Sequence, residues 1–301
     1  MLEKPDFAHF SLSAFVVFCN ILSDKTDKHS AYNAGMEYLD KYIPKELLAL
    51  KINYCKKRLR ELPRVSMIKG SIRGIPVVRL KSENHRFLSD SAKGRELSAV
   101  MAEREDLERQ LEVYEAIWNY HYRTDPPVFD PPKITRTFKN TNGEQVIMNK
   151  AFFDSLKNDA NTNYPKLTTH PFNGILYRSE YEKEAAMYYT ENKIPFKYEP
   201  ELYLFGSKKP QYPDFIFYIP ELDTCKIHEH LGLMNYTFYS RDLKLKCNTF
   251  IDAGLLIDQD VFFTFSDEDQ PLDTRYLAAK INTSIFGTMV CSNDWIANAN
   301  G

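Results

Sequence analysis

Two carboxylates occupy apolar, strand-like segments in the second half of the 301-residue chain. Asp214 belongs to the run 212–218 and Glu229 to the run 224–231, and both runs have the period of two of a strand. An ionised carboxylate among apolar neighbours is costly unless another charge compensates it. Two oxygen donors from adjacent strands are a minimal Mg²⁺ site, because Mg²⁺ keeps waters and substrate phosphate as its other ligands.

Two predicted helices carry further charged side chains on their apolar faces. In the helix expected over 178–193, the spacing places Glu182 with alanines and a tyrosine, on the face that should be buried. In the helix expected over 237–253, Lys246 shares a face with Phe250. A lysine that points inward stabilises charge developing on a phosphate. The alternative is a lysine at the edge of the apolar face whose amine reaches solvent.

The predicted elements follow the order helix, three strands, helix, strand, which is typical of an α/β core. The strands are expected at 196–205, 212–218, 224–231 and 261–265. A proline-rich break at 125–132 marks a domain boundary. We therefore expect a mostly helical N-terminal region with a β-hairpin over residues 1–125, an irregular linker over 126–170 and the α/β domain over 171–301.

Three short motifs stand out in this half: Arg178-Ser179-x-x-Glu182, Tyr212-Pro213-Asp214-Phe215 and Ile227-His228-Glu229-His230-Leu231-Gly232. Together they resemble the PD-(D/E)XK nuclease superfamily over about residues 175–285. More narrowly, they are similar to uncharacterised bacterial and phage-type proteins with the same strand motifs. The resemblance implies a restriction-endonuclease-like fold that binds Mg²⁺ or Mn²⁺. It further implies metal ligands at Asp214, Glu229, Glu182 and the backbone carbonyl of His230, and catalytic roles for Asp214, Glu229, Glu182 and Lys246.

One position departs from this pattern. The superfamily lysine stands two residues after the strand glutamate, where this sequence has Leu231. In some members the lysine lies on the following helix, and Lys246 is then the candidate. His228 and His230 share a strand face, but no third nitrogen or sulfur ligand stands at a suitable spacing, so a zinc site is not expected.

Basic residues concentrate between Lys41 and Lys81, where twelve bases face two acids. A basic helix over 45–62 followed by a basic hairpin over 72–88 suits phosphate binding. The side chains expected to bind nucleic acid are those of Lys56, Lys57, Arg58, Arg60, Lys69, Arg73 and Arg79. The alternative is a solvated helix face.

Composition limits the other classes of protein. The net charge is −2, and no glycine-rich phosphate loop is present. Five scattered cysteines favour reduced thiols and a cytoplasmic location. The longest apolar stretch, 10–22, is short and interrupted, so no membrane association is expected. The apolar stripe of the long helix expected over 93–122 permits a homodimer.

These observations predict a metal-dependent endonuclease that hydrolyses phosphodiester bonds. DNA is favoured over RNA by the resemblance, and restriction or phage defence is the setting that it suggests. Two alternatives stay open. One is a nucleic-acid-binding module on a nuclease fold that has lost catalysis, and the other is a phage structural or interaction protein whose long helix mediates assembly.

Overall fold

The computed structural model describes residues 43–290, apart from 84, 133, 164, 165, 167, 168, 233–236 and 267–272, and of residues 69, 70, 237–242 and 290 it describes only the backbone. The chain divides into two compact units. Lys45–Pro131 forms the first, here called the helix–hairpin unit. The described residues from Pro132 onward belong to the second, here called the mixed-sheet unit. Both contain helices and strands, so the protein is of the mixed α and β class.

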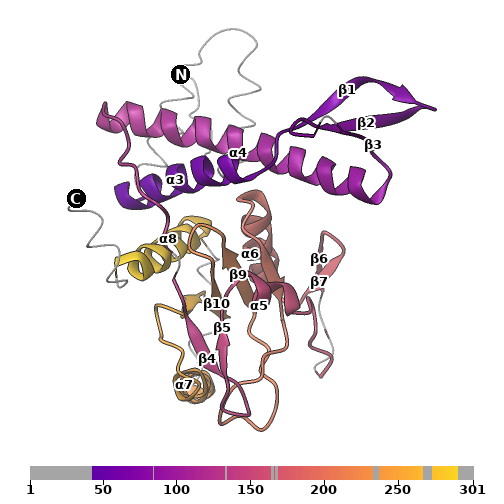
Figure 1. Ribbon diagram of the computed structural model, residues 1–301. Helices are drawn as coiled ribbons and strands as arrows, with labels where there is room; N and C mark the ends of the chain where they lie inside the picture. Colours follow the sequence, from indigo (N-terminus) through magenta and orange to yellow (C-terminus); the bar gives the residue numbers. More distant parts are fainter. Residues whose placement is uncertain are drawn as a thin grey trace, which may run out of the picture. The chain divides into compact units, whose positions relative to one another are not determined.

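The helix–hairpin unit combines two helices with a three-stranded antiparallel sheet. Its elements are α3 (Lys45–Glu61), β1 (Val65–Ile72), β2 (Ile75–Leu80), β3 (His85–Leu88) and α4 (Ala92–Tyr122), with the sheet order β1-β2-β3. Figure 1 shows α3 lying along α4. The apolar side chains of α3 are largely buried, among them Leu48, Ile52 and Cys55. The Ser91 hydroxyl caps α4 by accepting a hydrogen bond from the Gly94 amide at 3.0 Å.

The hairpin differs from the expectation of one strand over 72–80. The chain reverses at Arg73 and Gly74, and Ile72 pairs with Ile75 across a two-residue turn. Both turn residues have positive φ, 56° and 78°, as a type I′ hairpin turn requires. Arginine is not one of the usual residues at the first position of this turn, so the turn is hard to recognise from its residue types.

A four-stranded mixed sheet forms the centre of the second unit. Its strands are β8 (Phe196–Tyr198), β9 (Phe215–Ile219), β10 (Thr224–Leu231) and β11 (Val261–Phe265), in the spatial order β11-β10-β9-β8. β9 runs antiparallel to both β8 and β10, and β11 runs parallel to β10. With α6 (Glu180–Glu191), α7 (Thr237–Asp252) and α8 (Thr274–Val290), the chain order is α6-β8-β9-β10-α7-β11-α8. The predicted order of helix, three strands, helix and strand is therefore present.

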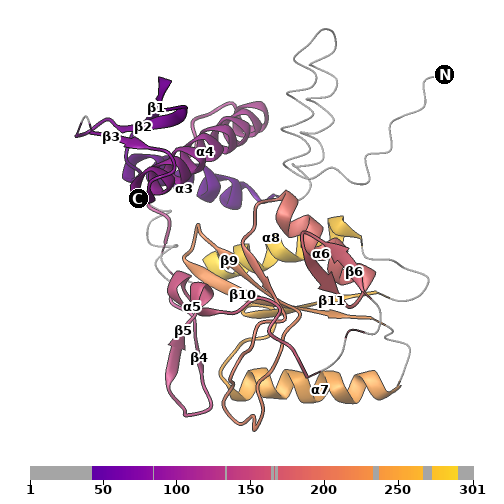
Figure 2. The same ribbon diagram turned by 90° about the vertical axis from the view of Figure 1, so that its right-hand side faces the viewer.

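Helices cover both faces of this sheet (Figure 2). On one face, Phe250 of α7 belongs to the same core as Ile216 and Ile227 of the central strands. On the other face, Tyr189 of α6 stacks against Phe217 of β9. Alternate residues of each central strand thus enter two different cores, as a sheet covered on both faces requires.

The segment 126–170 was expected to be an irregular linker, but its part from Pro132 onward contributes regular elements to the mixed-sheet unit. These are β4 (Thr137–Lys139), β5 (Gln145–Ile147) and α5 (Lys150–Ser155), and β6 (His170–Phe172) pairs with β7 (Ile175–Tyr177) just beyond. Phe138, Met148 and Phe153 are buried in the core of the sheet. Elements of three to six residues show little periodicity in the sequence, which explains why this segment gave no recognisable pattern.

No helix in the described part of the chain combines the length and apolar character needed to cross a bilayer. Among the same residues, Cys55, Cys225 and Cys247 are not part of a disulfide bond.

Candidate active site

The two strand carboxylates lie at neighbouring positions of the mixed sheet. Glu229 is in the second half of β10 and is fully buried, whereas Asp214 precedes β9 by one residue. The sequence predicted that Asp214 lies within a strand, and this is wrong, because the residue lies just before β9. Pro213 has no N–H to donate to a strand ladder, and β9 begins only after it. The Asp214 carboxylate instead accepts a hydrogen bond from the His230 amide of β10 at 2.6 Å.

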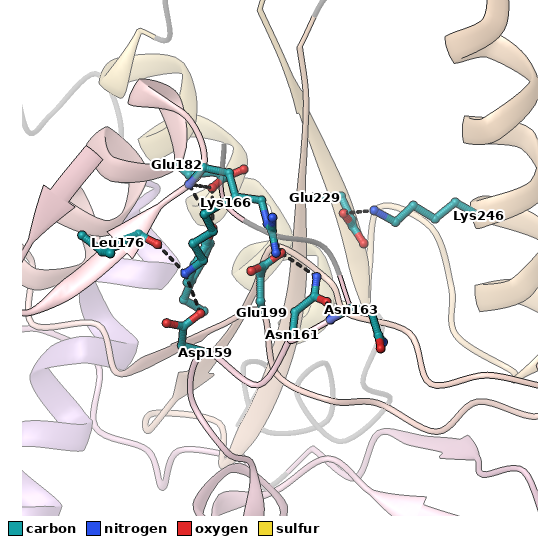
Figure 3. Close-up of polar contacts among 11 residues, drawn as sticks. Asp159, Asn161, Asn163, Lys166, Leu176, Glu182, Glu199, Glu229 and Lys246 are labelled. Carbon is teal, nitrogen blue, oxygen red and sulfur yellow. Dashed lines mark hydrogen bonds and ion pairs between the residues drawn. The ribbon is translucent and has the colours of Figure 1, made fainter. Parts of the chain in front are cut away.

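Lys246 reaches this site from α7, as its helical face predicted. Its amine donates a hydrogen bond to Oε2 of Glu229 and forms an ion pair with it (Figure 3). The Lys246 side chain is 32% exposed and the Glu229 side chain is 0% exposed. Water therefore reaches the lysine of this ion pair but not the glutamate. Oε1 of Glu229 is buried without a hydrogen-bond partner. Such an oxygen is costly to bury and is available to a ligand.

Burial sets the electrostatics of Glu229. Its pKa is raised to about 8, because removal from water and the charge of Asp214 together outweigh the opposing effect of Lys246. Glu182 is affected in the same direction, since burial and the charge of Asp214 raise the pKa of its carboxyl. The charge of Asp214 therefore acts on both Glu182 and Glu229, and the pKa of each of these two carboxyls lies above its usual value.

Glu182 has a local structural role besides its place in this group. Ser179 caps α6 by accepting a hydrogen bond from the Glu182 amide at 3.2 Å. Oε2 of Glu182 accepts hydrogen bonds from the Arg178 amide at 2.9 Å and from the Tyr198 hydroxyl at 2.6 Å. The Ser-x-x-Glu spacing is that of a capping box, but the Glu182 carboxylate accepts from the amide of Arg178, one residue before the N-cap Ser179.

A further set of polar contacts surrounds the buried side chain of Glu199. Oε1 of Glu199 accepts hydrogen bonds from Arg178 at 2.7 Å and from Asn161 at 2.9 Å (Figure 3). Oε2 of Glu199 is buried without a partner, and the residue has a φ of 39°. Residues other than glycine adopt such a φ only when contacts with the surrounding structure stabilise it, and such residues are often found near functional sites. The amide of Glu199 donates to the carbonyl of Asp214 at 3.0 Å, which connects the two positions directly.

The histidines of β10 point to the sheet face opposite Glu229. His228 contacts Tyr189 through Nδ1 at 2.8 Å and Thr264 through Nε2 at 2.7 Å. His230 contacts the same Thr264 hydroxyl through Nδ1 at 2.8 Å and Ser266 through Nε2 at 2.9 Å. Burial lowers the pKa of both imidazoles. They form a neutral hydrogen-bonded row, and no side-chain role in metal binding follows for them.

The donor set at Asp214 and Glu229 fits a hard divalent cation better than a soft one. Carboxylate oxygens are the ligands that Mg²⁺ and Mn²⁺ prefer, and Oε1 of Glu229 lacks any other partner. Within the described residues, no group of three or more His, Cys, Asp or Glu side chains is arranged to hold a metal ion. A cation here would depend on two carboxylates, a backbone carbonyl and non-protein ligands, which is the mode of binding usual for Mg²⁺.

The basic residues predicted to bind nucleic acid fall into two groups. Lys56, Lys57 and Arg58 of α3 form ion pairs with acids of the same unit, namely Glu115 at 2.7 Å, Asp130 at 3.8 Å and Glu103 at 2.7 Å. Hydrogen bonding to Glu103 raises the pKa of Arg58. Arg60, Arg73 and Arg79 make no ion pair with the described residues, and the side chain of Lys69 lies outside them.

No protein-family model matches the chain, and neither the curated proteins nor the solved structures with which it was compared include a match. Conclusions about function therefore depend on the site itself.

Proposed function

We propose that the mixed-sheet unit is a metal-dependent nuclease domain of the PD-(D/E)XK type, which hydrolyses phosphodiester bonds with Mg²⁺ or Mn²⁺ as cofactor. The observation that carries this proposal is the pair of Asp214 and Glu229. One is fully buried with an oxygen that has no partner, and a lysine from the following helix reaches it. Buried carboxylates that repel each other are compensated by a cation in many enzymes of phosphate chemistry.

The residues of this chain have separate roles in the proposed reaction. Asp214, Glu229 and the carbonyl of His230 would hold the cation, which when bound supplies Lewis-acid activation of water and of the phosphate. The His230 amide orients Asp214. The amine of Lys246 is positioned at Glu229, where it can stabilise negative charge that develops on a phosphate oxygen. Leu231, in the usual lysine position, is buried in the core and cannot replace it.

Glu182 is proposed to tune the site electrostatically. Its carboxyl has a raised pKa because it is buried and because Asp214 is charged. A proton on Glu182 reduces the repulsion at Asp214, and its loss adds a negative charge that attracts a second cation or its water. DNA is the proposed substrate and restriction or phage defence the proposed setting, both from the resemblance of the motifs.

The test combines cleavage with a binding measurement that does not depend on turnover. Labelled duplex DNA, single-stranded DNA and RNA are incubated with Mg²⁺, Mn²⁺ or EDTA, and Mn²⁺ binding is followed by electron paramagnetic resonance. We expect cleavage that needs metal and is lost in Asp214→Asn and Glu229→Gln, with weaker Mn²⁺ binding in both. Glu191→Gln, which removes an exposed carboxylate at the end of α6, is the matched control.

A second pair of variants tests the lysine. Lys246→Ala should lose cleavage while it retains Mn²⁺ binding. Lys244→Ala should behave as the wild type, because Lys244 is exposed on the same helix. Equal loss in both variants would contradict the role assigned to Lys246.

The alternative of a nuclease fold without catalysis rests on one observation, the ion pair of Lys246 with Glu229, which occupies one oxygen of the proposed metal site. If this pair is permanent, the folded protein should bind nucleic acid without binding Mn²⁺ and without cutting any of the three substrates.

A further inference from the structure

The two basic segments of the helix–hairpin unit differ in whether their charge is compensated. Helix α3 contains six bases and two acids, and α4, which packs along it, contains seven acids and four bases. Ion pairs join the two helices, as at Lys56 with Glu115 and Arg58 with Glu103. The positive charge of α3 is thus largely neutralised inside the unit, and this face has little capacity left for an external anion.

The sheet of the same unit has no comparable acidic partner. Residues 64–88, which contain β1, β2 and β3, include six bases and a single acid. That acid, Glu83, contacts His85 at 3.1 Å. Among the described residues, Arg73, Arg79 and Arg86 have no ion-pair partner, and the Nε of Arg79 is buried without a hydrogen bond.

Two of these arginines face each other on adjacent strands. Arg79 of β2 and Arg86 of β3 are partners in the strand register. Val78 and Leu80 pack towards Leu97 of α4, so the alternation of side chains directs Arg79 to the opposite face of the sheet. Like charges in directly opposed positions are destabilising. Two arginines in directly opposed positions without a neighbouring acid therefore indicate a site where an anionic partner would compensate the positive charge.

The shape of the sheet adds a second, independent observation. β3 pairs only with Val77–Leu80, so the outer parts of β1 and β2 form a two-stranded ribbon. The ribbon ends at the exposed turn of Arg73 and extends past β3 (Figure 1). A two-stranded antiparallel ribbon is one of the elements that the major groove of B-form DNA accommodates.

We propose that this sheet binds the phosphate backbone of double-stranded DNA, with Arg79 and Arg86 contacting phosphates on the face away from α4 and the Arg73 turn extending along the groove. The inference rests on the proposed function, since it assigns the binding of the nuclease substrate to a surface of the helix–hairpin unit. Of the residues predicted from the sequence to bind nucleic acid, it keeps Arg73 and Arg79 and omits the lysines of α3, and it adds Arg86.

The test measures affinity without catalysis. Full-length protein is titrated into a fluorescently labelled DNA duplex of mixed sequence in EDTA, over a series of salt concentrations. Arg79→Gln/Arg86→Gln is compared with Lys56→Gln/Lys57→Gln, which removes the same charge from the same unit. Each lost phosphate contact makes the negative slope of log K against log salt shallower by about 0.9. The slope of the arginine variant should therefore be shallower by about 1.8, and at about 0.1 M salt this variant should bind DNA on the order of 50-fold more weakly.

The lysine variant should keep the wild-type slope, because Lys56 and Lys57 are paired with acids in the wild-type protein and therefore contact no phosphate. Arg73→Gln/Lys81→Gln, at two exposed positions, serves as a second sheet variant if the first fails to fold, and it should also lower the slope. Thermal unfolding establishes that each variant is folded.

Three results would overturn the proposal: an unchanged slope in both sheet variants, an equal loss in the lysine variant, or tighter binding of double-stranded RNA, whose narrow major groove excludes a ribbon. These results are separable from failure of the nuclease proposal. Metal-dependent cutting that is independent of the arginines would refute only the DNA-binding surface. DNA binding that needs the arginines without any cutting would refute only the nuclease.

Discussion

Replacement of Glu229 by glutamine tests whether burial or the ion pair with Lys246 decides the protonation of this side chain. Burial raises the pKa of Glu229 from 4.5 to about 8. A carboxyl whose pKa is higher in the folded than in the unfolded protein binds its proton more tightly when folded. Its contribution to stability is therefore complete below pH 4.5 and is lost as the pH rises through about 8.

The magnitude follows from the two pKa values. A rise from 4.5 to about 8 corresponds to at most about 5 kcal/mol of unfolding free energy. Between about pH 5.5 and about pH 8.5, the wild-type protein should lose about 3 kcal/mol relative to Glu229→Gln, because glutamine does not titrate. Lys246 remains partly solvated when its partner is neutral, so the loss of the ion pair itself should cost little.

Urea unfolding at these two pH values, followed by circular dichroism, measures the difference. EDTA is present throughout, since a bound cation would hold Glu229 in its ionised form. Glu191→Gln serves as the control, because water solvates that exposed carboxylate in the folded and in the unfolded chain. Its free energy relative to the wild type should be the same at both pH values.

An unchanged difference for Glu229→Gln between the two pH values would refute the reasoning. It would mean that Lys246 keeps the carboxylate ionised throughout and that the ion pair dominates burial. A wild-type protein that gains stability over the variant as the pH rises would contradict even the direction of the shift.

Three further substitutions test the packing. Gly94→Ala should destabilise the helix–hairpin unit by about 2 kcal/mol or more in urea unfolding, because the added Cβ would lie 1.8 Å from the backbone oxygen of Leu88. Gly287→Ala, within α8 and with no atom near the new Cβ, should instead stabilise its unit by about 0.5–1 kcal/mol in the same assay. Arg136→Ala leaves the fully buried Asp260 without the cation that pairs with it, and should lower the unfolding free energy at neutral pH by about 3–5 kcal/mol.

The strands and helices that carry the site were predictable because each has a strong local pattern. Alternation in β10 separates Glu229 from His228 and His230, and the structure places them on opposite faces of the sheet. Helical spacing put Lys246 on the same side of α7 as Phe250, and it reaches Glu229 from there. Both patterns depend only on near neighbours in the chain, which is the information that a single sequence contains.

The contacts at Glu199 and on α3 were not predictable in this way. Glu199 directly follows β8 and has a left-handed conformation, and its partners Arg178 and Asn161 are 21 and 38 residues away. Similarly, the lysines of α3 resemble an anion-binding face in the sequence, but in the structure acids of α4 lie beside them and form ion pairs, as Glu115 does with Lys56. Charge in a sequence is local, whereas its compensation is decided by tertiary contacts.

The row of hydrogen bonds beneath the sheet has a consequence for where its protons lie. The Thr264 hydroxyl carries one proton but contacts a nitrogen of His228 and a nitrogen of His230. It can donate to only one of them, so the other imidazole must donate to it. Because each neutral ring has one donor and one acceptor nitrogen, a histidine that accepts from Thr264 must donate through its other nitrogen, to Tyr189 in the case of His228 or to Ser266 in the case of His230. The other histidine must then donate to Thr264, so the two imidazoles cannot both turn an unprotonated nitrogen towards this hydroxyl, and the tautomer of one limits the tautomer of the other.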